Sequence, residues 1–125
     1  MRSKPYAGLV LRVLAAESPA LGPGKAELVE LIDETGSISA AARAMDMSYR
    51  RAWLLVEAMN ASFVQPLVLT EVGGTRGGGA RVTAFGRRVV EEYRKMQFKA
   101  SAAVAADLKA FSRHLRKPRR KSGLI

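Results

Sequence analysis

The sequence predicts a mainly α-helical fold with one small β-hairpin, and three observations lead to this expectation. Apolar residues recur at spacings of three and four along three segments, which is the spacing of amphipathic helices. Two short segments of strand-forming residues enclose a run of glycines, which is typical of a hairpin. Serine or threonine stands at the position of a helix N-cap before three helical segments.

Two elements are expected in the first third of the chain. Residues 9–14 are mostly apolar, include two β-branched valines and are bounded by turns, so they predict a short strand. The loop at residues 22–25 leads into a helix over 26–35, where leucine and isoleucine recur at helical spacing. Pro23 suits the first turn of that helix, and Gly36 is its expected C-cap because glycine tolerates the left-handed conformation.

Two more helices follow, with a short turn between them. Residues 40–45 predict the first helix, with Ser39 as its N-cap. Residues 48–63 predict the second helix, with Ser48 as its N-cap. Two helices joined by a turn of about three residues, with a third helix before them, are the plan of a helix-turn-helix unit.

The helix over 48–63 separates into two faces on a helical wheel. The face expected to pack into the core comprises Ala52, Val56, Met59 and Phe63. The opposite face and its shoulders comprise Tyr49, Arg50, Arg51, Trp53, Leu54 and Glu57. The basic and aromatic groups are confined to the first turns, which are the part of a second helix that meets base edges in the DNA major groove.

We therefore expect DNA contacts from Ser48, Tyr49, Arg50, Arg51 and Leu54. Arginine offers two donors to guanine or a clamp on phosphate, and tyrosine reaches phosphate or a thymine methyl group. Trp53 is expected to pack against the hairpin instead. The alternative for the two arginines is simple solvation, which is common at exposed helix starts although the helix dipole disfavours cations there.

Residues 67–72 and 80–83 predict the two strands of the hairpin, with a glycine-rich tip over 73–79. A hairpin directly after the second helix makes the unit a winged helix-turn-helix. Arg76 at the apex and Arg81 near the base are expected to contact the DNA backbone or a narrow minor groove. The glycine run at 73–79 is not a nucleotide-binding loop, because it lacks the Gly-Lys-Ser/Thr ending. The alternative to a DNA-contacting wing is a simple flexible connector.

A long helix is expected from Ala84 to about Leu115, with Thr83 as its cap. Its apolar stripe comprises Phe85, Val89, Tyr93, Met96, Ala100, Ala103, Val104, Leu108, Phe111 and Leu115. An unbroken helix of this length is about 45 Å long, and one small domain cannot cover such a stripe. We therefore expect a homodimer whose interface combines this helix with the first helix.

The net charge of +10 favours a polyanionic partner, and it is unevenly distributed. Six of the 21 basic residues lie between Arg113 and Lys121, so the rest of the chain is only mildly basic. The expected organisation is one DNA-binding domain with its dimerisation helix over residues 1–112 and a basic tail over 113–125.

Several functional classes are disfavoured by the composition. The chain has no cysteine and one histidine, His114, so thiolate chemistry is excluded and no metal site is expected. No nucleophile motif indicates an enzyme, and no cofactor is expected. The chain lacks an apolar run of about 18 residues and an evident signal peptide, so we expect no membrane partner and a cytoplasmic, nucleoid-associated location.

The combined motifs resemble the DNA-binding domain of the ModE family, which comprises molybdate-responsive bacterial and archaeal transcription regulators. The resemblance covers roughly residues 9–98. It is carried by Gly-Ser-Ile-Ser-Ala-Ala-Ala at 36–42, Ser-Tyr-Arg-Arg-Ala-Trp at 48–53, Met59-Asn60, the glycine-rich wing at 73–83 and Phe-Gly-Arg-Arg at 85–88. LysR-type regulators share a similar helix-turn-helix opening, but the multi-glycine wing favours ModE.

The resemblance implies a sequence-specific transcription regulator that binds double-stranded DNA as a dimer. The helix over 48–63 would enter the major groove, and the wing at 73–79 would contact flanking DNA. Family members bind molybdate or tungstate in separate C-terminal domains, which nothing in these 125 residues resembles, so we do not expect direct molybdate binding.

Two alternative functions remain open. A sequence-neutral, nucleoid-type binder would depend mainly on the basic tail, and its specific and non-specific affinities would be nearly equal. A protein-interaction module would use the long helix to pair with another protein and would lose DNA affinity at moderate salt while keeping its dimer.

Overall fold

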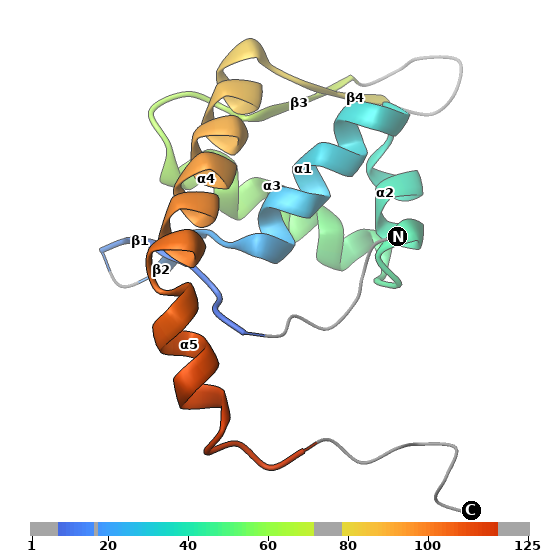
Figure 1. Ribbon diagram of the computed structural model, residues 1–125. Helices are drawn as coiled ribbons and strands as arrows, with labels where there is room; N and C mark the ends of the chain where they lie inside the picture. Colours follow the sequence, from blue (N-terminus) through green and yellow to red (C-terminus); the bar gives the residue numbers. More distant parts are fainter. Residues whose placement is uncertain (1–7, 17, 72–78, 118–125) are drawn as a thin grey trace, which may run out of the picture.

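The computed structural model describes residues 8–16, 18–71 and 79–117. Three helices and the wing hairpin form a compact body, and two further helices run along one side of it and project beyond it (Figure 1). The mainly α-helical fold with a small hairpin is therefore confirmed. The helices are α1 (Pro23–Thr35), α2 (Ile38–Ala44), α3 (Tyr49–Ser62), α4 (Ala84–Ala103) and α5 (Ala105–Ser112). The strands are β1 (Val13–Ala15), β2 (Ser18–Leu21), β3 (Val68–Glu71) and β4 (Gly79–Val82).

Helix α1 is the centre of the body. Its buried side chains include Leu28, Val29 and Ile32, which pack with residues of α2, α3 and β4 in one core. Gly36 ends the helix at φ 70°, in the left-handed region, and its N–H donates to the Ile32 carbonyl at 2.7 Å. The predicted glycine C-cap is confirmed, and it turns the chain sharply into α2.

The predicted cap of α2 is wrong. Ser37, rather than Ser39, is the N-cap, and its Oγ accepts from the Ala40 N–H at 3.0 Å. The helix therefore begins at Ile38, which is only 5% exposed, whereas Ser39 faces solvent. Both serines satisfy the local capping chemistry, and the burial of Ile38 favours the earlier start.

The N-terminal strand prediction is only partly right. Strand β1 begins at Val13, and it pairs antiparallel with β2, which was not predicted. A proline-containing segment such as β2 gives a weak strand signal because proline cannot donate to the ladder. The pairing with β1 shows that Pro19 lies on an edge strand, where this loss is tolerated.

The predicted long helix is interrupted. Val104 leaves the helical conformation at φ −110° and ψ 15°, so α4 ends at Ala103 and α5 begins at Ala105. The break falls among small residues after Tyr93, the last buried side chain of α4, and α5 has no buried side chain. Core packing therefore does not hold the two helices in line.

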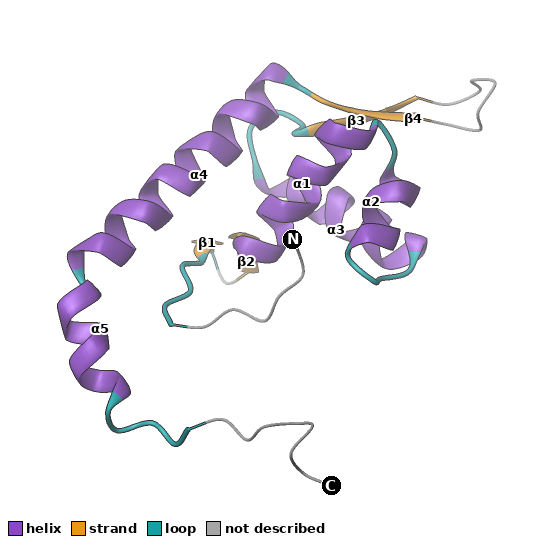
Figure 2. Cartoon of the chain, turned by 45° about the vertical axis from the view of Figure 1, so that its right-hand side comes forward, coloured by secondary structure: helices purple, strands orange, loops and turns teal. Residues whose placement is uncertain are grey.

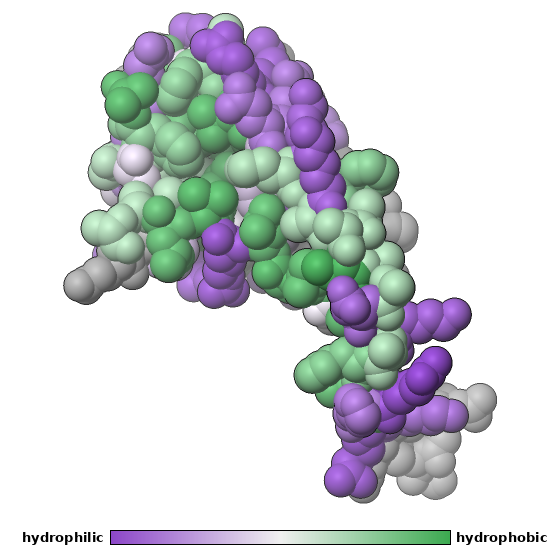
Figure 3. Space-filling model, turned by 60° about the vertical axis from the view of Figure 1, so that its left-hand side comes forward, coloured by the Kyte–Doolittle hydropathy of each residue, from purple (hydrophilic) through white to green (hydrophobic). Residues whose placement is uncertain are grey.

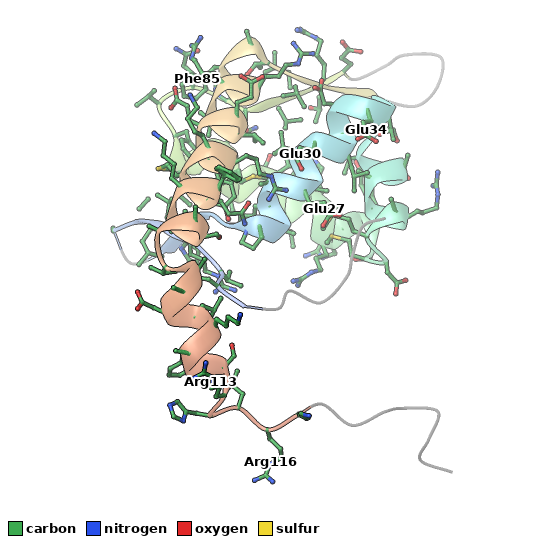
Figure 4. The ribbon with its side chains drawn as sticks, in the orientation of Figure 1. Glu27, Glu30, Glu34, Phe85, Arg113 and Arg116 are labelled. Atoms are coloured by element: carbon green, nitrogen blue, oxygen red, sulfur yellow. The ribbon has the colours of Figure 1, made fainter. Side chains whose placement is uncertain are left out.

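Helix α4 is fastened across α1 by polar contacts as well as by its apolar face. The Arg87 guanidinium contacts the Asp33 carboxylate at 2.9 Å, and that of Arg94 contacts Glu30 at 2.8 Å. Glu30 lies between the two helices (Figure 4). The Tyr93 hydroxyl donates to the Leu11 carbonyl at 2.7 Å, which also ties the N-terminal segment to α4.

The wing hairpin is held in a fixed position against the helices. Strands β3 and β4 pair in register from Val68 with Val82 to Glu71 with Gly79. The Ala80 N–H donates to the Gly36 carbonyl at 3.0 Å, which joins β4 to the end of α1. The ends of the hairpin strands far from α4 and the turn between α2 and α3 both lie on the side of the body away from α4 and α5, with α2 between them (Figures 1 and 2).

Candidate nucleic-acid interface

The start of α3 is built by local hydrogen bonds. Ser48 is its N-cap, as predicted, and its Oγ accepts from the Arg51 N–H at 3.1 Å. The preceding turn includes Asp46 at φ 58°, and the Met47 N–H donates to the Ala42 carbonyl at 3.0 Å. The turn between α2 and α3 therefore fixes the direction in which the first turns of α3 face.

The two predicted faces of α3 are confirmed. Ala52, Val56 and Met59 are buried, with exposed fractions of 0–3%, and Phe63 packs against the same core. The outward side chains are all exposed, and they are Tyr49, Arg50, Arg51, Trp53, Leu54 and Glu57. The packing of Trp53 against the hairpin stays a prediction.

Four of the five predicted DNA-contacting residues around the start of α3 line one surface. Ser48, Arg50, Arg51 and Leu54 line a shallow depression of about 290 Å³ at the start of the helix, together with Leu55. Among the described residues, neither Arg50 nor Arg51 forms an ion pair with a carboxylate. Both guanidinium groups are therefore presented to solvent, where a polyanion can reach them.

The hairpin contributes a separate basic residue. Arg81 on β4 is exposed, and its Nε lies 3.7 Å from the Glu71 carboxylate of β3, with both side chains about 60% exposed. An exposed pair at this distance contributes little to stability, so Arg81 can exchange Glu71 for another anion. Arg76, the predicted apex residue, lies outside the described residues.

The basic residues of the tail are distant from α3. Arg113 and Arg116 lie at the far end of α5 (Figure 4), and both are exposed, as is His114. Within the described ranges, no group of three or more histidine, aspartate or glutamate side chains is placed to hold a metal ion. No helix in the same ranges is long and apolar enough to cross a membrane.

One basic cluster was missed by the sequence reasoning. Arg12, Lys25 and Arg51 line a common cavity of about 360 Å³ beside the start of α3. Burial lowers the pKa of Lys25 from its usual value. The three residues come from separate segments, so no motif or spacing in the sequence could have grouped them.

Helices α1–α3 with the hairpin β3–β4 define a winged helix-turn-helix domain. The solved structure of the CbnR_DBD–DNA complex has the same fold, with a TM-score of 0.54 at 21% sequence identity. That alignment covers 70% of this chain and 94% of the CbnR chain. No family model matches the sequence.

Curated relatives identify the kind of winged-helix domain. The chain is 38% identical over 85 residues to the molybdenum transport protein ModE of Azotobacter vinelandii, covering 68% of this chain and 32% of that protein. It is 38% identical over 103 residues to the molybdenum-pterin-binding protein MopB of Rhodobacter capsulatus. That match covers 82% of this chain and 37% of MopB. The DNA-binding transcriptional dual regulator ModE of Escherichia coli K12 matches over 71 residues at 37% identity. That match covers 57% of this chain and 27% of the Escherichia coli protein.

This winged-helix chain is similar to a part of the ModE and MopB proteins. It spans about a third of the length of the first two relatives. The resemblance derived from the sequence motifs is therefore confirmed for this stretch.

Proposed function

We propose that this chain is a sequence-specific, double-stranded DNA-binding transcription regulator that acts as a homodimer, with the start of α3 in the major groove. The observation that carries the proposal is the exposed surface of Tyr49, Arg50, Arg51 and Leu54 on the second helix of a winged helix-turn-helix. Relatives from Escherichia coli and Haemophilus influenzae are named as transcriptional regulators, which supports the same function. The proposal assigns no molybdate site and no enzymatic reaction to the described residues.

Each residue of the α3 surface has a role suited to its chemistry. Arg50 is the proposed base-reading residue because its guanidinium can donate two hydrogen bonds to guanine. Arg51 and Tyr49 are proposed to contact phosphate, and Leu54 offers an apolar contact for a thymine methyl group. Ser48 accepts from the Arg51 N–H through its oxygen, and its hydroxyl hydrogen remains available to donate to a phosphate.

The wing is proposed to contact flanking DNA through Arg76 and Arg81. Exchange of the weak pairing with Glu71 for a phosphate would let Arg81 support the DNA complex from the base of the hairpin. The ends of the hairpin strands far from α4 lie on the side of the body away from α4 and α5, as does the start of α3 (Figures 1 and 2), so one duplex could meet both elements.

The homodimer proposal rests on apolar surface that the body does not cover. Beyond Tyr93, α4 and α5 expose Met96 at 47%, Phe98 at 74% and Phe111 at 59%. Apolar side chains continue along these helices on the face shown in Figure 3. Exposed apolar area of this kind indicates an interaction surface. Helix α1 is covered by α4 of the same chain. We therefore propose a dimer interface on the outer face of α4 and on α5, without the contribution of α1 that the sequence predicted.

Selection from a random duplex library tests the function as a whole. We expect the full chain to enrich a defined sequence and to bind it more tightly than random duplex of equal length at the same salt concentration. Equal affinities for the two duplexes would contradict sequence-specific regulation and favour the sequence-neutral binder. Absence of DNA binding with an intact dimer would favour a protein-interaction module.

Replacing Arg50 by alanine is expected to weaken binding to the selected sequence by about 1–3 kcal/mol, the range for loss of a two-donor base contact. Binding to random duplex should weaken much less, because phosphate contacts remain. The measurement is a pair of fluorescence-anisotropy titrations at one salt concentration. Arg116→Ala, which removes the same charge from the exposed segment beyond α5, is the control. Equal losses on both duplexes would make Arg50 a phosphate contact.

Replacing Phe111 by glutamate is expected to shift the chain from dimer toward monomer, because the new charge would be buried without a partner in the dimer interface. The monomer should fold normally, since Phe111 is 59% exposed and outside the core. Sedimentation velocity measures the shift. Val64→Glu also replaces an apolar side chain by glutamate, at an 89% exposed loop position, and should leave the dimer intact. An unchanged dimer in Phe111→Glu would place the interface elsewhere.

A further inference from the structure

The cavity beside α3 is formed where the N-terminal segment, α1 and the turn between α2 and α3 meet. Its volume is about 360 Å³, which is within the usual range for small-molecule sites. Arg12, Lys25 and Arg51 contribute three basic side chains to its lining, and among the residues that the structure describes no aspartate or glutamate lines it. A cavity with this charge balance attracts anions and disfavours cations.

The basic side chains are positioned by contacts within the domain. The Lys25 ammonium donates to the Pro19 carbonyl at 2.8 Å, which draws it toward β2. The Arg12 side chain lies across Gly22, with its Cγ 3.3 Å from the point that a Cβ on Gly22 would occupy. Arg51 enters from the first turn of α3. Three separate elements therefore direct basic groups toward one space.

The remainder of the lining is largely apolar. Val10, Met45, Met47 and Leu55 contribute to it, and the last three are partly buried against the core. A phosphate or another small inorganic oxyanion has no apolar part to place against such a wall. An anion that carries an apolar body would satisfy both the basic groups and the apolar wall.

We propose that this cavity binds a small amphipathic anion, such as an aromatic carboxylate, with its charged group near Arg12, Lys25 and Arg51 and its apolar body against Met45, Met47 and Leu55. Methionine suits such a wall because its flexible, polarizable side chain adapts to different shapes. The site adjoins the exposed face of α3, and Arg51 and Leu55 line both.

Arg51 connects the cavity to the candidate DNA surface. A ligand carboxylate that engages its guanidinium would compete with a DNA phosphate for the same donors. Such a ligand would weaken DNA binding, and DNA would weaken ligand binding by the same factor. This coupling rests on the proposed DNA-binding function, whereas occupation of the cavity by the ligand does not.

Methionine methyl resonances offer a direct test in the full chain without DNA. With ¹³C-methyl-labelled methionine, titration with 2-naphthoate should shift the Met45 and Met47 signals saturably. The signals of Met59 in the core and Met96 on α4 should move little, because neither residue lines the cavity. Met45→Leu and Met47→Leu variants assign the two signals. Absence of saturable shifts at both positions would overturn the proposal.

Three further probes test the ligand chemistry. The neutral 2-naphthamide, inorganic phosphate and molybdate should each produce much smaller shifts at equal concentration. A response to 2-naphthamide as large as that to 2-naphthoate would show that the basic groups play no part, and a full response to phosphate or molybdate would show that the apolar wall plays none. Shifts caused by a short DNA duplex but not by 2-naphthoate would assign the cavity to DNA contact. Each of these results would overturn the amphipathic-anion site.

Gly24 allows a matched pair of variants at the edge of the cavity. A Cβ on Gly24 would meet no atom within 4 Å, and the residue lies in the first turn of α1, where an acidic side chain favours the helix. Gly24→Glu should therefore fold normally and weaken 2-naphthoate binding about tenfold through repulsion of the ligand charge. Gly24→Gln has the same size without the charge and should retain most of the affinity. Equal affinity in the two variants would overturn the role assigned to the basic groups.

The coupling to DNA has its own test. Saturating 2-naphthoate should weaken binding of the wild-type chain to DNA, and it should have much less effect on Gly24→Glu. If 2-naphthoate shifts the methionine signals but leaves DNA affinity unchanged, the site stands and the coupling through Arg51 is wrong. If the chain binds no DNA at all, the proposed function fails while the methyl titration still decides the ligand site.

Discussion

Replacing Gly86 by alanine is expected to lower the free energy of unfolding by about 3 kcal/mol, the upper part of the usual range for overpacking a core. Gly86 is buried in the first turn of α4, and an added Cβ would collide with the Leu67 carbonyl oxygen. It would also lie 3.0 Å from the Cα and carbonyl carbon of Leu67. Leu67 cannot easily retreat, because its carbonyl accepts from the Thr83 N–H at 2.9 Å. Urea unfolding followed by circular dichroism measures the loss.

Gly24→Ala is the matched control for that experiment. Gly24 also lies in the first turn of a helix, but an added methyl group there meets no atom within 4 Å. We expect this variant to be more stable than the wild type by about 0.4–1 kcal/mol, since alanine restricts the unfolded chain and favours the helix. Wild-type stability in Gly86→Ala would contradict the close approach of α4 to Leu67.

Replacing Asn60 by alanine is expected to cost about 3 kcal/mol of stability. The Asn60 side chain joins α3 to the start of the hairpin, because its Oδ1 accepts from the N–H groups of Leu67 and Val68 at 2.8 and 3.2 Å. Its Nδ2 donates to the Val68 carbonyl at 2.9 Å. Leu67 and Val68 are almost fully buried, so their polar groups would lose a partner that solvent cannot readily replace.

Two further variants make the Asn60 prediction specific. Asn60→Asp keeps an acceptor for the two N–H groups and loses the donor, so we expect a stability between those of wild type and Asn60→Ala. Ser62→Ala removes a hydroxyl that bonds only to the Ala58 carbonyl within α3, and its cost should be below about 0.5 kcal/mol. Urea unfolding of all three variants gives the comparison. Equal stabilities of Asn60→Ala and Ser62→Ala would mean that the side-chain bridge does not hold the hairpin.

The close contacts of Gly86 and Asn60 show how the ModE-like motifs relate to the structure. Both residues lie in motifs that carried the resemblance to the ModE family, but the contacts they make are with other parts of the domain. Asn60 and Gly86 set the hairpin against α3 and α4. The exposed residues at the start of α3 are the ones proposed to meet DNA. Some motif positions thus hold the wing and others face outward, while Ile38, Ala41 and Ala42 are buried in the core.

Local sequence chemistry determined much of the domain. The caps at Gly36, Ser48 and Thr83 depend on atoms within four residues in the chain, so glycine, serine and threonine indicated them directly. The two faces of α3 followed from its 3.6-residue period, because side chains at that spacing share one side of a helix. The predicted DNA-facing residues of α3 are exposed for the same reason.

The tertiary structure decided what depends on neighbours distant in sequence. Burial of Ile38 favours Ser37 over Ser39 as the N-cap of α2. The segment that contains Pro19 is a strand because it pairs with β1. The break at Val104 falls beyond Tyr93, the last buried side chain of α4. The cavity shared by Arg12, Lys25 and Arg51 exists only because three elements meet there. Such features have no local signature, because the interactions that fix them form only once the chain has folded.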